Sequence, residues 1–292
     1  MTVANRPRRS VLYMPGSNAR ALEKAKTLAA DGLILDLEDA VAPDAKDVAR
    51  EQVCAAVQAG GYGQRELLIR VNALSTPWGY ADLEAAATAG ADAVLLPKVD
   101  SADMVRQSER LLDAAGAPAE LKIWCMMETA RGMLHAKEIA GASARMGGFV
   151  MGTSDLAREL NCAHTAMRLP MITSLGLCLL AARAAGLAIV DGVYLDLNDA
   201  DGFAASCTQG RELGMDGKTL IHPKQIDAAN QAFAPSEAEV EHARKIIEAH
   251  REATARGQGV VVLDGKLIEN LHVVMAERVV AQAEAIAAMT DA

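Results

Sequence analysis

The chain has 292 residues, of which 51% are hydrophobic and 23% are charged, and its formal net charge is -9. This length suits one large α/β domain or two ordinary ones. The acidic balance and the lack of a basic tract argue against nucleic acid or an anionic membrane surface as the main partner.

Signals for export or membrane insertion are also missing. No apolar run approaches the roughly 18 residues of a membrane span, and the start, MTVANRPRRSVLYMPG, lacks the apolar core and cleavage site of a signal peptide. Five scattered cysteines form no CxxC pair, which is typical of small buried side chains rather than disulfides or zinc ligands. We therefore expect a cytoplasmic protein.

Eight short, mostly apolar segments recur along the chain, each followed by turn or polar residues. They are residues 10–16, 32–39, 66–72, 93–99, 122–128, 148–155, 187–196 and 218–224. Between them lie stretches with apolar residues three and four apart, such as NARALEKAKTLAA and LPMITSLGLCLLAARAAG, which indicate helices. Strand and helix thus alternate about every 30 residues.

The predicted strands are mostly apolar and do not alternate between polar and apolar residues, as expected of a parallel sheet covered on both faces. Eight such units predict an α/β fold, a closed (β/α)8 TIM barrel over residues 1–232, with an open doubly wound sheet as the alternative. The first strand is not followed by the GxGxxG that would favour the open sheet. Residues 233–292 are predicted to form a helical extension, with a hairpin or extended piece between two helices, that contacts a neighbouring subunit.

Polar side chains follow nearly every predicted strand, at the end where the βα loops of a barrel converge. In chain order they are Ser17, Asn18, Asp36, Glu38, Asp39, Arg70, Asn72, Lys98, Glu128, Asp155, Asp196, His222 and Lys224. Glu128 and Asp155 end adjacent strands, so their carboxylates are placed to share one ion. Oxygen ligands suit Mg²⁺ rather than Zn²⁺. Arg70 offers a planar fork for a substrate carboxylate or a developing oxyanion.

These residues also have purely structural interpretations. Asp155 stands where an aspartate can cap the following helix. A buried salt bridge from Glu128 to Arg131 or Arg70 would explain that glutamate without any ion. Three further carboxylates either hold the ligand residues in place through hydrogen bonds or serve as loop and capping residues: Asp36, Glu38 and Asp39.

A series of longer motifs runs through almost the entire chain. They are RRSVLYMPGSNARALEKAKTLAADGLILDLEDAVAPDAKDVAR, LLIRVN, LLPKV, METARG, GTSDLAREL, DGVYLDLNDADGF, ELGMDGKTLIHPKQI and FAPSEAEVEHARKI. In this order they resemble the citrate lyase beta subunit-like family of CoA-ester lyases, which includes malyl-CoA, citramalyl-CoA and citryl lyases. The resemblance implies a Mg²⁺-dependent (β/α)8 enzyme, a homo-oligomer (trimer or hexamer), that makes or breaks a carbon–carbon bond between a 2-oxo acid and an acyl-CoA enolate.

The resemblance also implies roles for particular residues. It places the metal on Glu128 and Asp155, and the substrate on Arg70 together with Gly152 and Thr153. Three basic residues are candidate contacts for the phosphates or ribose of CoA, with ordinary exposed helix charge as the alternative: Arg20, Lys24 and Lys46.

One position departs from the family. Within DGKLIENLHV, Glu269 stands where the family usually has an aspartate that reaches over from the adjacent subunit as an acid or base. Glutamate retains the carboxyl group but is one methylene longer. Arg70 and Glu269 are therefore the expected catalytic residues, and the substitution leaves the substrate and the lyase or hydrolase outcome open.

We expect a lyase that cleaves a 3-hydroxyacyl-CoA, such as malyl-CoA, citramalyl-CoA or citryl-CoA, into a 2-oxo acid and acetyl-CoA. The same enzyme could catalyse the reverse reaction, which forms the 3-hydroxyacyl-CoA. Two alternatives remain open: hydrolysis of the malyl-CoA thioester at the same site, and a role as a subunit of a citrate lyase-type complex. The choice between CoA and an acyl-carrier protein also stays open.

Overall fold

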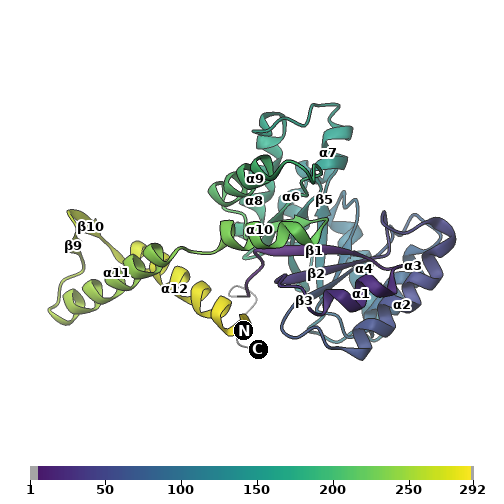
Figure 1. Ribbon diagram of the computed structural model, residues 1–292, viewed down its shortest axis with the longest axis horizontal. Helices are drawn as coiled ribbons and strands as arrows, with labels where there is room; N and C mark the ends of the chain where they lie inside the picture. Colours follow the sequence, from purple (N-terminus) through teal and green to yellow (C-terminus); the bar gives the residue numbers. More distant parts are fainter. Residues whose placement is uncertain (1–5, 291–292) are drawn as a thin grey trace. The chain divides into compact units, whose positions relative to one another are not determined.

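The computed structural model describes residues 6–290, and the contacts within the chain divide them into two units (Figure 1). The first unit is Arg8–Phe233. The second joins residues 6–7 to residues 234–290. Among the described helices, none is both long enough and apolar enough to cross a membrane.

The first unit is a closed barrel of eight parallel strands, which confirms the predicted fold. The strands follow one another around the barrel in chain order, and β1 pairs with both β2 and β8 to close it. Each strand overlaps one predicted segment. They are β1 (Ser10–Pro15), β2 (Gly32–Asp36), β3 (Glu66–Arg70), β4 (Ala93–Leu96), β5 (Lys122–Met127), β6 (Met146–Met151), β7 (Ala188–Asp191) and β8 (Gly217–Leu220).

Helices connect the strands and cover the outside of the barrel (Figure 1). They are α1 (Ala19–Ala25), α2 (Lys46–Ala59), α3 (Gly79–Ala87), α4 (Ala102–Ala114), α5 (Ala130–Leu134), α6 (Ala136–Ala140), α7 (Thr153–Glu159), α8 (Ile172–Ala184), α9 (Ala200–Leu213) and α10 (Ile226–Phe233). Leu33 and Leu35 of β2 pack in the large cluster with these helices, whereas Ile34 packs in a second cluster with Trp124 and Val150. Both faces of β2 are therefore apolar, which explains why this segment of the sequence shows no alternation.

The seventh strand is shorter than predicted. It ends at Asp191, and Asp196 lies five residues further on, exposed in a loop. The chain leaves the sheet at Gly192, where an added Cβ would lie 2.6 Å from the Thr153 Oγ1 atom. The carboxylate that ends this strand is fully buried and is bound by the Lys218 ammonium at 2.8 Å. The residue delivered by β7 is thus Asp191, and it is paired inside the protein.

The second unit contains two helices and the predicted hairpin. Its elements are α11 (Glu237–Ala255), β9 (Val261–Leu263), β10 (Lys266–Ile268) and α12 (Asn270–Thr290). A capping box between Ser236 and Glu239 begins α11. Asp264 and Gly265 join β9 to β10, and both have positive φ, as the tight two-residue turns of hairpins require.

Candidate active site at the barrel mouth

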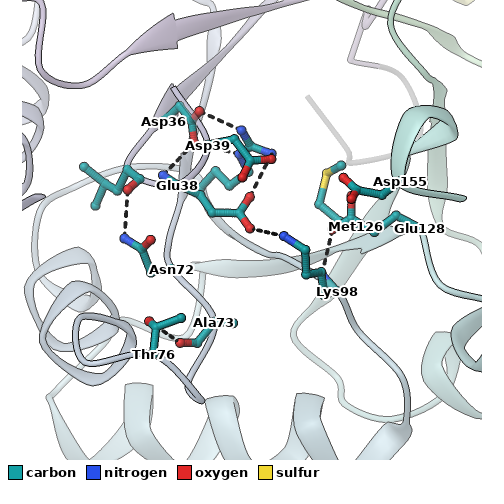
Figure 2. A network of polar contacts seen from close by, with 12 residues as sticks. Asp36, Glu38, Asp39, Asn72, Ala73, Thr76, Lys98, Met126, Glu128 and Asp155 are labelled. Carbon is teal, nitrogen blue, oxygen red and sulfur yellow. Dashed lines mark hydrogen bonds and ion pairs between the residues drawn. The ribbon is translucent and has the colours of Figure 1, made fainter. Parts of the chain in front are cut away.

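Two groups of charged side chains lie at the C-terminal ends of the strands, and Lys98 connects them (Figure 2). One group surrounds Arg70 at the end of β3. The other contains Glu128, which follows β5, and Asp155, which lies near the start of α7. The structure thus brings the predicted ion ligands and the predicted substrate arginine to the same end of the barrel.

Arg70 is only 7% exposed and is held on three sides. Its Nε and Nη2 atoms donate to the two carboxylate oxygens of Asp36, both at 2.6 Å. Its Nη1 atom forms an ion pair with the Glu38 Oε2 atom at 2.9 Å, and the guanidinium lies 4.8 Å from the centre of the Tyr13 ring. Burial alone would lower the pKa of Arg70, but its bonds to Asp36 and the nearby negative charges raise it. Arg70 is therefore a fixed, permanently charged group.

The three carboxylates near Arg70 differ in their surroundings. Asp36 is fully buried and also accepts hydrogen bonds from the backbone N–H groups of Glu38 and Ala40, so it shapes the loop and holds Arg70 at the same time. Glu38 is buried, and this burial raises its pKa despite the cations beside it. Asp39 is exposed and lies 3.8 Å from Arg70.

Lys46 lies inside this part of the protein instead of facing a ligand. Its ammonium donates to the carbonyl oxygens of Leu37 and Glu38 and to the Asn72 Oδ1 atom, at 2.7 to 2.8 Å. These three bonds use the three N–H groups of a lysine. Lys46 therefore fixes the loop that carries Glu38, and its ammonium has no N–H left for a phosphate of CoA.

Glu128 is 2% exposed, and the surrounding chain orients its carboxylate. The backbone N–H of Lys98 donates to the Oε1 atom at 2.8 Å. A Cβ on Gly152 would lie 2.4 Å from the Oε2 atom, so only glycine leaves this space. Burial raises the pKa of Glu128 to about 7, and the negative charges of Glu38 and Asp155 act in the same direction.

The structure does not support the purely structural interpretations, in which Glu128 forms a salt bridge and Asp155 caps a helix. Within the described chain, Glu128 forms no ion pair with Arg131 or Arg70. The residue that caps α7 is Gly152, and the Asp155 side chain pairs with Arg158 at 2.6 Å instead of capping the helix. Asp155 lies beside Glu128 (Figure 2) and is 23% exposed.

This pair of carboxylates suits a hard divalent ion. Burial and neighbouring negative charge oppose the ionised form of Glu128, and a cation between the two carboxylates would relieve both effects. No group of three or more His, Cys, Asp or Glu side chains in residues 6–290 is arranged to hold an ion. Mg²⁺ accepts such a site because it keeps several waters and often uses only one or two protein carboxylates.

The sequence predicts Lys98 at the C-terminal ends of the strands but does not indicate any binding or catalytic role for it. Its ammonium donates to the Glu38 Oε1 atom at 2.6 Å, while its N–H reaches Glu128. Partial burial acts to lower the pKa of Lys98, but the bond to Glu38 raises it overall. The only signal in the sequence is its position just after a strand, which is why its role was missed.

Two cavities lie near the mouth. One of about 290 Å³ is lined by Thr153, His164, Tyr194 and neighbouring residues. Thr153 is buried, and its carbonyl oxygen lies 3.1 Å from the His164 Nε2 atom. The other, of about 270 Å³, lies beyond the ends of β3 and β4 and includes Asn72. Both have room for part of a small substrate.

Three predicted site residues are exposed: Arg20, Lys24 and Glu269. Arg20 and Lys24 are exposed on α1, where Asn18 caps the helix through a hydrogen bond from Ala21. Glu269 is exposed just before α12 and belongs to the second unit. Their roles as CoA contacts and as an acid or base stay predictions.

Comparisons with known proteins agree with this architecture. Residues 9–223 match the family model described as HpcH/HpaI aldolase/citrate lyase, and residues 170–287 match a C-C bond lyase model of the TIM-barrel fold. The (3S)-malyl-CoA thioesterase of Cereibacter sphaeroides (strain ATCC 17023) is 55% identical over 97% of this chain and 96% of its own length. Citrate lyase subunit beta of Escherichia coli (strain K12) is 39% identical over 96% of this chain and 94% of its own length.

A solved structure is similar over nearly the whole chain. It is the crystal structure of protein CitE from Mycobacterium tuberculosis in complex with magnesium, acetoacetate and coenzyme A. The TM-score is 0.76 at 29% sequence identity, covering 96% of this chain and 99% of that one.

Proposed function

The chain belongs to the HpcH/HpaI aldolase/citrate lyase family, and from this premise we propose that it hydrolyses the thioester of malyl-CoA to give malate and free CoA. The observation that carries the proposal is the 55% identity to (3S)-malyl-CoA thioesterase along nearly the full length of both chains. This identity reverses the order expected from the sequence, in which the lyase came first and the hydrolase second.

Glu128 and Asp155 are the proposed ligands of Mg²⁺, which when bound would neutralise and polarise the oxygens of the hydroxy-acid end of the substrate. Lys98 and Gly152 orient the Glu128 carboxylate. Arg70 attracts the substrate carboxylate through its permanent charge. Glu38 forms an ion pair with the Nη1 atom of Arg70, so the substrate carboxylate must compete with Glu38 for this atom.

Hydrolysis also needs a base that takes a proton from water. We propose Glu269 of an adjacent copy for this step, as the family resemblance implies. Its carboxylate is exposed within its own chain and is therefore accessible to a second one. Arg20 and Lys24, exposed on α1, are proposed to contact the phosphates of CoA. The working form is then a cytoplasmic homo-oligomer, a trimer or hexamer.

The second candidate is the carbon–carbon lyase. The 39% identity to a citrate lyase subunit beta favours it, as does the similar structure solved with magnesium, acetoacetate and coenzyme A. In that reaction the bond between the hydroxyl-bearing carbon and the thioester α-carbon breaks, which gives glyoxylate and acetyl-CoA from malyl-CoA. Both reactions begin with the same substrate bound in the same way.

One assay separates them. The purified chain is incubated with malyl-CoA and Mg²⁺, and free thiol and 2-oxo acid are measured in the same sample. We expect one thiol for each substrate consumed and no glyoxylate. Glyoxylate without free thiol would overturn the hydrolase in favour of the lyase. If malyl-CoA gives neither product, the same two measurements on citramalyl-CoA and citryl-CoA identify the acyl group.

A further inference from the structure

Lys98 has a backbone conformation that is unusual for its residue type. Its φ is 50°, in the left-handed region. The other described non-glycine residues with positive φ are Asn161, Arg168 and Asp264. Asparagine and aspartate accept this region because their short side chains bond locally, whereas lysine has no such compensation. Something in the surrounding structure must therefore hold Lys98 in place.

The residues after Lys98 contact α5 and the residues that flank this helix. A Cβ on Gly132 would lie 2.3 Å from the Val99 carbonyl oxygen, so the two backbones approach as closely as a glycine allows. The Thr129 hydroxyl donates to the Asp100 carboxylate at 2.5 Å. The Asp100 carbonyl oxygen lies 2.9 Å from the His135 Nδ1 atom. These three contacts fix the backbone that Lys98 must join.

The two ends of Lys98 reach the two halves of the site (Figure 2). We propose that Lys98 is a positioning residue that couples them: its left-handed backbone aims the amide N–H at Glu128, and its ammonium occupies one oxygen of Glu38, so that only the other oxygen pairs with Arg70. The inference rests on the proposed divalent-ion site at Glu128 and Asp155, but not on whether the enzyme is a hydrolase or a lyase.

The two parts of Lys98 have separable effects. The N–H occupies the Oε1 atom of Glu128 and leaves the Oε2 atom for an ion. The ammonium bonds the Oε1 atom of Glu38, whose Oε2 atom pairs with Arg70. Without the ammonium, both oxygens of Glu38 become available to Arg70 and compete with a substrate carboxylate. The backbone thus governs ion binding, and the side chain governs substrate binding.

The backbone role is tested with Lys98→Gly and Lys98→Val. Both lose the ammonium, but glycine accepts a positive φ and a β-branched residue opposes it. Mg²⁺ is titrated calorimetrically into the full-length, substrate-free chain. We expect Lys98→Gly to bind within about threefold of the wild type and Lys98→Val to bind at least about tenfold more weakly. Equal affinity of the two variants would overturn the backbone role.

Two controls keep this comparison decisive. Asn161→Val imposes the same strain at an exposed left-handed position and should leave Mg²⁺ affinity unchanged. If Lys98→Val does not fold, Lys98→Asn and Lys98→Ala repeat the comparison, because asparagine accepts positive φ more readily than alanine. We then expect the tighter binding from Lys98→Asn. A wild-type chain that binds no Mg²⁺ would overturn the proposed ion site and this inference together.

The side-chain role is tested with Lys98→Met and Lys98→Arg, which remove and retain the charge. For malyl-CoA, or whichever thioester the product assay identifies, we expect Lys98→Met to raise KM by about fivefold or more and to change kcat much less. Lys98→Arg should restore KM to within about twofold of the wild type. A wild-type KM in Lys98→Met would overturn the coupling, whichever products the enzyme releases.

Discussion

The chemistry of the site depends on how single carboxylates are compensated. Asp36 and Arg70 form a buried pair with two short hydrogen bonds, and each would be costly to leave alone. Glu128 is equally buried, but its carboxylate has only one backbone N–H as a hydrogen-bond donor among the described residues. The buried charge of Asp36 is therefore compensated by Arg70, whereas the buried carboxylate of Glu128 forms no ion pair among the described residues and could bind a cation as a ligand. This contrast marks Glu128 as the residue that a cation would stabilise most.

The raised pKa of Glu128 leads to a stability prediction for the ion-free protein. The folded chain keeps this proton up to about pH 7, whereas an unfolded glutamate loses it near its ordinary value. Between these values the folded state binds more protons, so stability falls as pH rises, by roughly 3 kcal/mol for this group. Urea unfolding with a chelator present, at about pH 5 and about pH 8, measures this loss. Glu128→Gln should lose less stability over that range.

Added Mg²⁺ provides the complementary test at the higher pH. It should stabilise the wild type, because a ligand that binds only the folded state favours folding, and it should do so much less in Glu128→Gln. Equal pH dependence in the two proteins would show that Glu128 is not the group responsible.

At the scale of elements, the strands were predictable because most of their residues are apolar, and this property is visible in the sequence. The end of β7 was not. The apolar residues after Gly192 predict a longer strand, but the chain leaves the sheet at Gly192, which lies close to Thr153. The contacts within the site were likewise hidden. The positive φ of Lys98 and the buried position of Lys46 follow from loop packing, which no local pattern encodes.

Two glycines supply a matched pair of variants: Gly152, in the turn between β6 and α7, and Gly176, inside α8. At Gly152 an added Cβ would lie 2.4 Å from Glu128 atoms, so Gly152→Ala should displace that carboxylate and weaken Mg²⁺ binding by about tenfold or more. Gly176, inside α8, has nothing within 4 Å of an added Cβ. Gly176→Ala should therefore stabilise the fold by about 1 kcal/mol without changing ion affinity. Calorimetry and denaturant unfolding measure both effects, and equal ion affinity in the two variants would refute the role given to Gly152.

At the scale of the whole molecule, the chain consists of a barrel that carries the proposed ion site and a second unit that carries Glu269. The second unit leaves several large apolar side chains exposed: Val260, Val262, Leu267, Leu271, Val274 and Met275. Such a surface is typical of one that contacts another chain. A homo-oligomer in which this unit meets a neighbouring copy would cover these side chains and bring Glu269 into use.

Oligomerisation through the second unit can be tested with charge substitutions. Val274→Glu and Met275→Glu place a charge on the exposed side of α12 and should lower the mass in solution, because a carboxylate in an apolar interface is costly. Val48→Glu makes a similar change at an exposed position of α2 and serves as the control. Sedimentation or light scattering measures the mass. An unchanged mass in the α12 variants would contradict assembly through this unit.

The most direct test of the proposed enzyme is the release of free thiol from malyl-CoA by a chain stripped of metal, as Mg²⁺ is added back. The wild type and Asp155→Asn are compared, with circular dichroism to establish that both are folded. We expect thiol release to depend on Mg²⁺ in the wild type and to be nearly absent in Asp155→Asn at every concentration. Full thiol release by the wild type in excess chelator, or by Asp155→Asn, would contradict a divalent ion held by Glu128 and Asp155.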